Sequence, residues 1–429
     1  MNKNKLLIYY SVLFVMLVFT WANRTFLPVV IRLAYLVFLF APCLKYTSLF
    51  APCLILFLTT SLLSFGYTFM PTEVGYYVLI AAVIALVTYS SYRKSIHIPL
   101  GAFVAFLVFV TLVNVIHSGT IERITYAFLL FIFLTLTVSQ EENVKLATEI
   151  IPLCFIIISL ACSILIWINQ RELMVDFAAG YERLWSSSIN YTCSTIGIGV
   201  IFALEIALDA KRRKYIRIIS LATMIISFKV LLAEASRGAF LVIAVSSVII
   251  ILFTKVKVYY KILVLLLLYG VVMYLYQHGY FDLLIYRVEM DDGTGSQRLS
   301  IWESKLNSFL NYDNPLVVLW GLGYSKTWGL GGEGLSFIGC HNDFVAFFIE
   351  YGVFGLGFLL FFLLFPLIKV SKKTRRHILP YLIFIIVDGL SLEPLSMGYL
   401  PMFFLLFYIY ILKIKDKTDA RMAQVESVS

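Results

Sequence analysis

Basic and titratable side chains recur where apolar helices are expected to begin. Arg237 follows Ser236 directly before the apolar run 239–253, and His341 precedes a second long apolar run. The start of a helix carries partial positive charge and unpaired amide donors, so an arginine there completes an anion site. Histidine is the usual acid or base near neutral pH. The pattern therefore predicts anion binding combined with proton transfer, although an arginine at a helix start can also anchor a span at the membrane interface.

A polar stretch adds a third element, because helical spacing puts Arg298, Trp302, Lys305 and Phe309 on one face. A guanidinium matches phosphate with a planar fork, and an aromatic ring packs on the apolar face of a sugar. This face suits a sugar diphosphate, which makes Arg298, Trp302 and Lys305 candidate binding residues. A helix lying at the membrane interface would show the same face, and the sequence leaves both interpretations open.

His341 differs from the other four histidines in its neighbours. Asn342 follows it directly, and Glu350 lies inside the apolar run that comes next. A carboxylate within a membrane span requires a partner or a cavity, so Glu350 and Asn342 are further candidates for contact with a substrate. The glycines after Glu350 allow close helix packing: Gly352, Gly355 and Gly357.

The stretch 321–339 is rich in glycine and contains Trp328. It lacks the lysine and hydroxyl residue that end a nucleotide-binding loop, and it follows no expected strand. We predict that it forms a mobile segment that covers the substrate.

The elements that position these residues must lie in lipid. Hydrophobic residues make up 61% of the 429-residue chain and charged residues 14%, against about 25% charged in an average soluble domain. The formal net charge of +9 indicates basic cytoplasmic loops rather than nucleic-acid binding, because no basic stripe with stacking aromatics lies in a soluble segment. The six cysteines form no paired motif, so we expect no disulfide framework, metal or cofactor.

Apolar runs long enough to span a bilayer recur along the whole chain. The first, at 6–22, lacks a cleavage site and is interpreted as an uncleaved helix. The expected fold is all-α, a polytopic bundle of about 12–14 transmembrane helices. The runs centre near Val15, Val37, Leu56, Ala82, Phe106, Phe131, Ile157, Ile198, Ile225, Val245, Leu267, Phe358, Ile385 and Phe407.

Charge orients this bundle with both termini in the cytoplasm, because most basic residues then fall inside. Lysine predominates on the inner side and arginine on the outer side, which favours a phosphate-bearing ligand outside. Two outer loops are large. The loop 169–188 contains Arg183, a candidate for substrate binding, and the loop 277–340 contains Arg298. In the second loop, an amphipathic helix is expected to lie on the membrane or to cap the bundle, with its apolar residues at helical spacing: Leu299, Trp302, Leu306 and Phe309.

A transporter or flippase is the alternative from a different class. Charges in the middle of the membrane would support it, and Lys229, Glu205 and Asp388 are the residues in question. Lys229 has a possible partner in Glu234. Against this alternative, the chain shows no internal repeat, and its distinctive residues gather at the outer face.

Taken in order, the motifs resemble the O-antigen ligase and polymerase superfamily. The residues that carry the resemblance are Ser236-Arg237-Gly238, Arg298 with Trp302, Gly321 with Gly323, His341-Asn342, and Glu350-Tyr351-Gly352 followed by Gly355-Leu356. They extend over about 234–365. The first 200 residues or so are similar to this family only in being membrane helices.

The resemblance implies a metal-independent, inverting membrane glycosyltransferase of the GT-C-like type in the bacterial inner membrane. The donor would be an undecaprenyl-diphosphate-linked glycan. Arg237 and Arg298 would bind the diphosphate, and His341 would take the proton from the attacking hydroxyl. We expect polymerisation of repeat units, with ligation to lipid A core or another acceptor as the alternative. Other expected partners are membrane lipid and a chain-length regulator.

The resemblance also implies a division of the chain into three parts. Residues 1–233 would form N-terminal transmembrane helices, and 234–368 would form the catalytic region with the outer loop 277–340. Residues 369–429 would hold C-terminal helices and a cytoplasmic tail.

Overall fold

The structure is a computed structural model, and it describes residues 100–118, 141–168, 174–176, 181–183, 189–209, 212–234, 236–253, 257–289, 297–332, 338–368, 370–391 and 410–411. The expected spans near Val15, Val37, Leu56, Ala82, Phe131 and Phe407 lie outside these residues.

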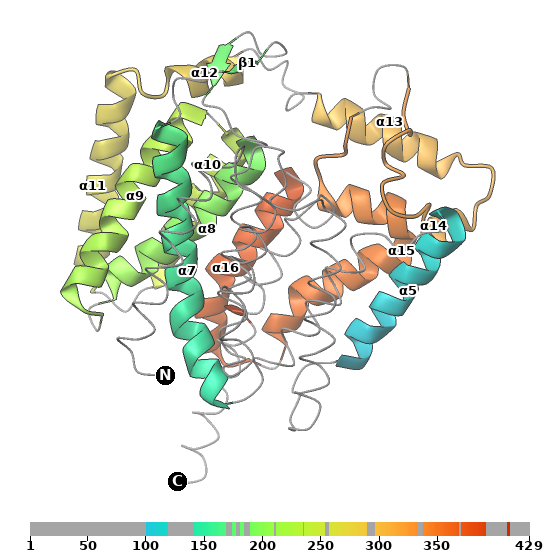
Figure 1. Cartoon of the computed structure of the whole chain (residues 1–429), viewed down its shortest axis with the longest axis horizontal. Coiled ribbons are helices and arrows are strands. Elements are labelled where there is room, and N and C mark those ends of the chain that lie inside the picture. The colour runs from blue at the N-terminus through green and yellow to red at the C-terminus, as the bar shows by residue number, and fades with distance from the viewer. Residues whose placement is uncertain are drawn as a thin grey trace, which may run out of the picture.

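Helices dominate the described part of the chain, which confirms the helical fold class (Figure 1). Each expected centre within the described ranges lies in a helix. The helices are α5 (Leu100–Ser118), α7 (Glu141–Ile168), α8 (Ile189–Leu208), α9 (Lys214–Glu234), α10 (Arg237–Phe253), α11 (Val258–Gln277), α12 (Asp282–Glu289), α13 (Arg298–Leu310), α14 (Val317–Trp320), α15 (Asp343–Leu364) and α16 (Lys372–Ser391), with a 3₁₀ turn at Phe365–Leu367.

Several of these helices have the length and apolarity of membrane spans. Among the described residues, three helices are long and apolar enough to cross a bilayer: α9, α11 and α15 with its 3₁₀ extension. Shorter apolar helices lie at Val108–His117, Ile151–Ile164, Thr192–Leu208 and Arg237–Phe253. The chain is therefore a helical membrane protein.

The one strand pair in the described residues belongs to the loop between α7 and α8. Strands β1 (Met174–Asp176) and β2 (Tyr181–Arg183) pair antiparallel, with Met174 opposite Arg183. This short hairpin is the only element there that departs from the expected all-α architecture.

Helices α7, α8 and α9 are joined by buried hydroxyls. Ser159 on α7 hydrogen-bonds the Ile196 carbonyl on α8 at 3.0 Å and the Ser227 hydroxyl on α9 at 2.9 Å. Ser163 donates to Ser227 as well, at 3.0 Å. Small polar residues of this kind let helices approach closely where lipid surrounds them.

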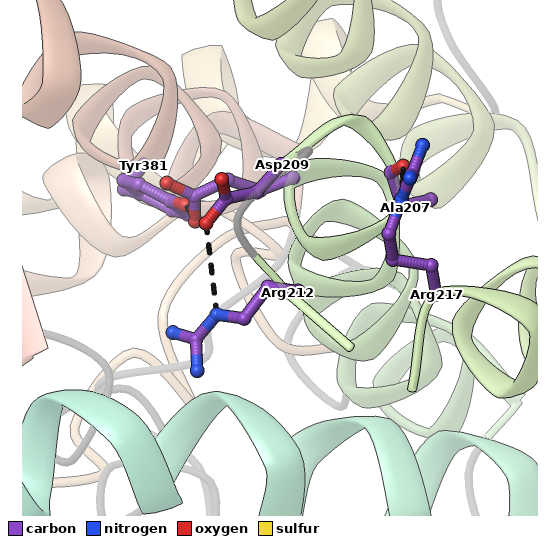
Figure 2. A network of polar contacts seen from close by, with 6 residues as sticks. Ala207, Asp209, Arg212, Arg217 and Tyr381 are labelled. Carbon is purple, nitrogen blue, oxygen red and sulfur yellow. Dashed lines mark hydrogen bonds and ion pairs between the residues drawn. The ribbon is translucent and has the colours of Figure 1, made fainter. Parts of the chain in front are cut away.

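Polar side chains also join the other end of α8 to α16 and α9. Tyr381 on α16 donates a hydrogen bond to Glu205 on α8. Just beyond α8, Asp209 and Arg212 form an ion pair of 3.7 Å, and Arg217 donates to the Ala207 carbonyl at 2.9 Å (Figure 2). Glu205 therefore has a partner from a neighbouring helix, as an intramembrane carboxylate requires.

Helix α15 is the centre of a second group with α5, α13 and α14 (Figure 1). Aromatic rings hold α5 against it: the Phe106 ring centroid lies 4.9 Å from that of Phe358 and 5.3 Å from that of Phe362. Helix α16 packs on both α15 and α10 and so connects the two groups of helices. This arrangement decides where the motif residues meet.

Candidate functional site

The expected amphipathic helix exists as α13, and it caps α15. The side chains of Ile301, Lys305 and Phe309 are buried. Phe309 packs edge-on against Phe348, with 5.2 Å between the ring centroids. Leu299, expected on the apolar face, is 55% exposed. The buried face therefore follows a spacing of four residues.

Trp302 connects α13 to the residues just before α15. Its indole N–H donates a hydrogen bond of 2.6 Å to the Cys340 carbonyl, and Cys340 is itself buried. A partly buried tryptophan usually finds a partner for its N–H. The bond fixes the backbone next to His341 on the first turns of α13.

His341 lies in a positive environment as a result. Burial lowers the pKa of this histidine first, and the charges of Arg298 and then Lys305 lower it further. All of these effects disfavour the imidazolium. The structure therefore brings together four of the residues that the sequence singled out, with the imidazole held in the neutral form that can accept a proton.

Asn342 begins α15. Its side-chain oxygen accepts hydrogen bonds from the amides of Phe344 at 2.9 Å and Val345 at 3.2 Å. Asparagine is a preferred residue for this capping role. The buried cap orients the first turn of α15 and holds the adjacent His341. Contact of Asn342 with substrate stays a prediction.

Arg237 is the first residue of α10, and α16 connects that helix to the start of α15. A Cβ on Gly238 would lie 2.9 Å from the Ser391 hydroxyl, and one on Gly389 would lie 3.3 Å from a carboxylate oxygen of Asp343. The last turn of α16 therefore contacts the first turns of both α10 and α15. Arg237 and His341 lie on either side of that turn.

The three catalytic candidates share one local setting. Arg237 begins α10, Arg298 begins α13, and His341 directly precedes the cap of α15. Each is placed where unpaired amides and the helix dipole favour negative charge. Converging helix starts of this kind can hold a diphosphate whose charge grows as it leaves.

Lys305 contributes inside this region rather than at its surface, because its side chain is 0% exposed. The ammonium donates to the carbonyls of Thr327 and, at 2.9 Å, Leu330. It therefore ties the glycine-rich segment to α13 while adding positive charge near His341. The sequence proposed substrate contact for Lys305, and the structure uses its donors on backbone carbonyls.

Glu350 holds the other end of the same segment. One carboxylate oxygen accepts from the Ser325 amide at 2.8 Å and from the Thr327 hydroxyl at 3.4 Å. The part of the glycine-rich stretch that is described, 321–332, was expected to be mobile. It is instead fastened by buried charged side chains from two helices.

Glycines in both segments allow the glycine-rich stretch to approach α15 closely. Gly352 interrupts α15 with a φ of 66°, and the carbonyls of Ile349 and Glu350 accept hydrogen bonds from the amides of Leu322 at 3.0 Å and Gly323 at 2.9 Å. A Cβ on Gly352 would lie 2.4 Å from the Leu319 carbonyl carbon. The motif with Gly321 and Gly323 and the motif with Glu350 and Gly352 therefore form the two sides of one backbone contact.

Helix α5 adds two residues that sequence reasoning missed. Asn114 accepts a hydrogen bond of 2.8 Å from the Tyr324 amide, and the His117 ring lies 3.1 Å from the Gly321 carbonyl. Both contacts join residues more than 200 positions apart in the sequence. In the sequence, the only sign of these contacts is that Asn114 and His117 are polar residues near the end of an otherwise apolar helix.

Backbone strain gathers in the same region. Within the described residues, the non-glycine residues with positive φ are Gln297, Ser325 and His341. Gln297 directly precedes Arg298. Ser325 lies in the turn of the glycine-rich segment, and His341 carries the imidazole. Strain of this kind concentrates at functional sites, where the surrounding structure has to hold it.

The remaining candidates lie elsewhere. Arg183 ends strand β2 in the loop between α7 and α8. Lys229 is exposed on α9, with its ammonium 4.2 Å from the centroid of the Trp167 ring. Asp388 is buried on α16 and accepts a hydrogen bond of 2.7 Å from Ser194 on α8.

These features define a helical membrane protein in which a histidine with a lowered pKa lies among the positive charges of Arg298 and Lys305, at the starts of α13 and α15. Residues 221–362 match the family model described as O-antigen ligase. The match contains every motif of the site and confirms the resemblance to the O-antigen ligase and polymerase superfamily. This family covers ligases and polymerase-like proteins, and its members are glycosyltransferase-like enzymes. No curated protein matches the chain.

Proposed function

We propose that the protein transfers a glycan from an undecaprenyl-diphosphate donor to a sugar hydroxyl on the extracytoplasmic side of the bacterial inner membrane. The observation that carries the proposal is the arrangement around His341. A half-buried histidine with a lowered pKa lies within electrostatic reach of Arg298 and Lys305, directly before the cap of α15. A neutral base beside a cationic anion site is what this transfer requires.

In the proposed reaction, neutral His341 accepts the proton of the attacking hydroxyl, whose oxygen forms a bond to the anomeric carbon of the donor. The bond from that carbon to the diphosphate oxygen breaks, with inversion. Arg298 and Arg237 stabilise the negative charge on the departing undecaprenyl diphosphate. Trp302 fixes the backbone that carries His341, and its ring adjoins the sugar. Protein groups supply all these roles, and we propose that no metal participates.

We favour polymerisation of lipid-linked repeat units as the overall reaction. The test uses the purified protein in detergent with an undecaprenyl-diphosphate repeat unit. Elongated lipid-linked products are expected from the wild-type protein, and His341→Ala is expected to abolish them. Trp320→Phe serves as a matched control, because Trp320 is an exposed residue of α14 outside the proposed site. A fully active His341→Ala protein would refute the proposal.

Ligation is the second candidate, and the description of the matching family favours it. A ligase would give no elongation with the repeat unit alone but would transfer the glycan when a lipid A core acceptor is added. A lack of transfer to either acceptor would shift support to the transporter alternative.

The remaining assignments follow from this proposal. Residues 234–368 would form the catalytic region, flanked by the membrane helices of 1–233 and by 369–429, with both termini in the cytoplasm. Membrane lipid and a chain-length regulator would be its partners. Arg183 would contact the substrate from the first outer loop, which requires that loop to approach the site when the glycan is bound.

A further inference from the structure

A rigid turn beside the proposed site presents an aromatic ring outward. Residues 325–328 form this turn, with the Trp328 amide donating to the Ser325 carbonyl at 3.1 Å. Thr327 is buried, whereas Lys326 and Trp328 on either side of it are exposed. The Trp328 side chain is 45% exposed.

The turn is fastened from two directions. Lys305 binds the Thr327 and Leu330 carbonyls, Glu350 binds the Ser325 amide, and the Ser304 hydroxyl accepts from the Gly332 amide at 3.0 Å. Here buried charged groups hold Thr327 inward and so force Trp328 outward.

The turn and His341 are attached to the same stretch of α13. Trp302 binds the Cys340 carbonyl next to His341, while Ser304 and Lys305 bind the segment that follows Trp328. These three α13 residues span a single helical turn. The segment next to Trp328 and the backbone next to His341 are therefore attached to one turn of the same helix.

We propose that Trp328 is a carbohydrate-binding platform for the acceptor glycan, which rests on the proposed glycosyl transfer. The C–H groups on one face of a pyranose ring are attracted to the electron-rich face of an indole. A preorganised ring loses little conformational freedom on binding, so the contact contributes most of its energy to affinity. Lys326 in the same turn offers ammonium donors to hydroxyl or carboxylate groups of that sugar.

The experiment measures binding without turnover. The probe is the free oligosaccharide repeat unit, released by mild acid from the lipid-linked intermediate of the native cells, and it is titrated against the full chain in nanodiscs. Saturation-transfer NMR gives the dissociation constant. Trp328→Leu is expected to weaken binding about tenfold, while Trp328→Phe retains most of it.

Trp320→Leu is the matched control, since Trp320 is 39% exposed in the same outer loop and lies outside the turn. It should bind the probe like the wild-type protein. The proposal is overturned by an absence of saturable binding to the wild-type protein, by unchanged affinity in Trp328→Leu, or by an equal loss in Trp320→Leu. A membrane anchor would accept leucine in place of tryptophan and so would give that unchanged affinity.

This result is separable from the test of the proposed function. If the protein binds the oligosaccharide through Trp328 but catalyses no transfer from the lipid-linked donor, the glycosyl transfer fails and the binding platform stands. If transfer occurs and Trp328→Leu leaves both the affinity and the acceptor KM unchanged, the platform fails and the transfer stands.

Discussion

His341 depends on neighbours whose charges oppose its protonation. Arg298 and Lys305 both lower its pKa, in addition to the effect of burial. At neutral pH the imidazole can therefore accept a proton from a hydroxyl. The same cations would favour a diphosphate, so in the proposed reaction one set of charges would serve both the donor and the base.

This coupling predicts the pH dependence of the reaction. As the pH falls, kcat/KM should hold until the imidazole protonates, below the ordinary histidine value of about 6.5. Arg298→Gln removes a positive neighbour, so the acid limb of the residual activity should move to higher pH. Arg298→Lys keeps the charge and should leave the limb in place. An acid limb that moves to lower pH in Arg298→Gln would contradict this account of the pKa.

Glu350 gives a second prediction at the residue scale. Because it accepts hydrogen bonds from the Ser325 amide and the Thr327 hydroxyl, a neutral glutamine can still accept both. Glu350→Gln should keep most activity and thermal stability. Glu350→Ala should lose both, since leaving buried donors unpaired costs about 1–3 kcal/mol. Thermal unfolding in detergent and the acceptor KM are the measurements. A Gln variant as impaired as the Ala variant would favour direct contact between the carboxylate and the substrate.

At the scale of elements, a break within α15 allows this helix to bind the glycine-rich segment. Its break at Gly352 exposes the carbonyls of Ile349 and Glu350 to the glycine-rich segment. A regular helix would use those carbonyls on its own amides and leave the segment without its main attachment. The E-x-G and G-x-G motifs are therefore explained as one structural device.

Two glycines of α15 should respond very differently to alanine. At Gly352 a Cβ would meet the Leu319 backbone at 2.4 Å, and φ is positive, so Gly352→Ala should sharply reduce folded protein and activity. At Gly357 nothing lies within 4 Å, and alanine is the better helix former by about 0.5–1 kcal/mol. Gly357→Ala should therefore be neutral or stabilising. The amount of monodisperse protein after extraction, with its melting temperature, checks both. A normal yield of Gly352→Ala would exclude the tight backbone contact.

For the whole molecule, the arrangement of helices predicts which surfaces face which compartment. Helix α9 is about 30 Å long, matching the hydrocarbon core of a bilayer, and it separates Arg213 from the start of α10. The start of α10, helix α13 and the start of α15 lie at the other end. The basic loop at Arg213 should then be cytoplasmic.

Cysteine labelling in intact cells tests this orientation. Glu303 on α13 and Arg213 before α9 are both exposed. A membrane-impermeant maleimide should label Glu303→Cys from outside but label Arg213→Cys only after the inner membrane is permeabilised. The unmodified chain is the background control, because its described cysteines are all buried. Labelling of both variants in intact cells would contradict the predicted orientation.

The sequence identified several residues that lie together better than it identified the contacts that hold them. Helical spacing predicted Arg298, Trp302 and Lys305 on one face, and in the structure α13 carries all three close to His341. Spacing could not show that Lys305 and Glu350 bind backbone groups more than 20 positions away, or that Asn114 and His117 approach from a distant helix. Such contacts depend on how helices pack, and an apolar helix can pack on lipid or on protein with the same pattern. Asp388 and Ser194 illustrate this, since only packing pairs them.

The hydrogen bonds across the break in α15 also bear on how the protein is made. Leu322 and Gly323 are synthesised before Ile349 and Glu350, and they must be in place when that helix enters the bilayer. Without the amides of Leu322 and Gly323, the two carbonyls at the break in α15 would enter the hydrocarbon without hydrogen-bond partners. This would cost several kcal/mol. Insertion of α15 is therefore coupled to correct assembly of the loop that bears the site. A chain with a misassembled loop would then be exposed to membrane proteolysis.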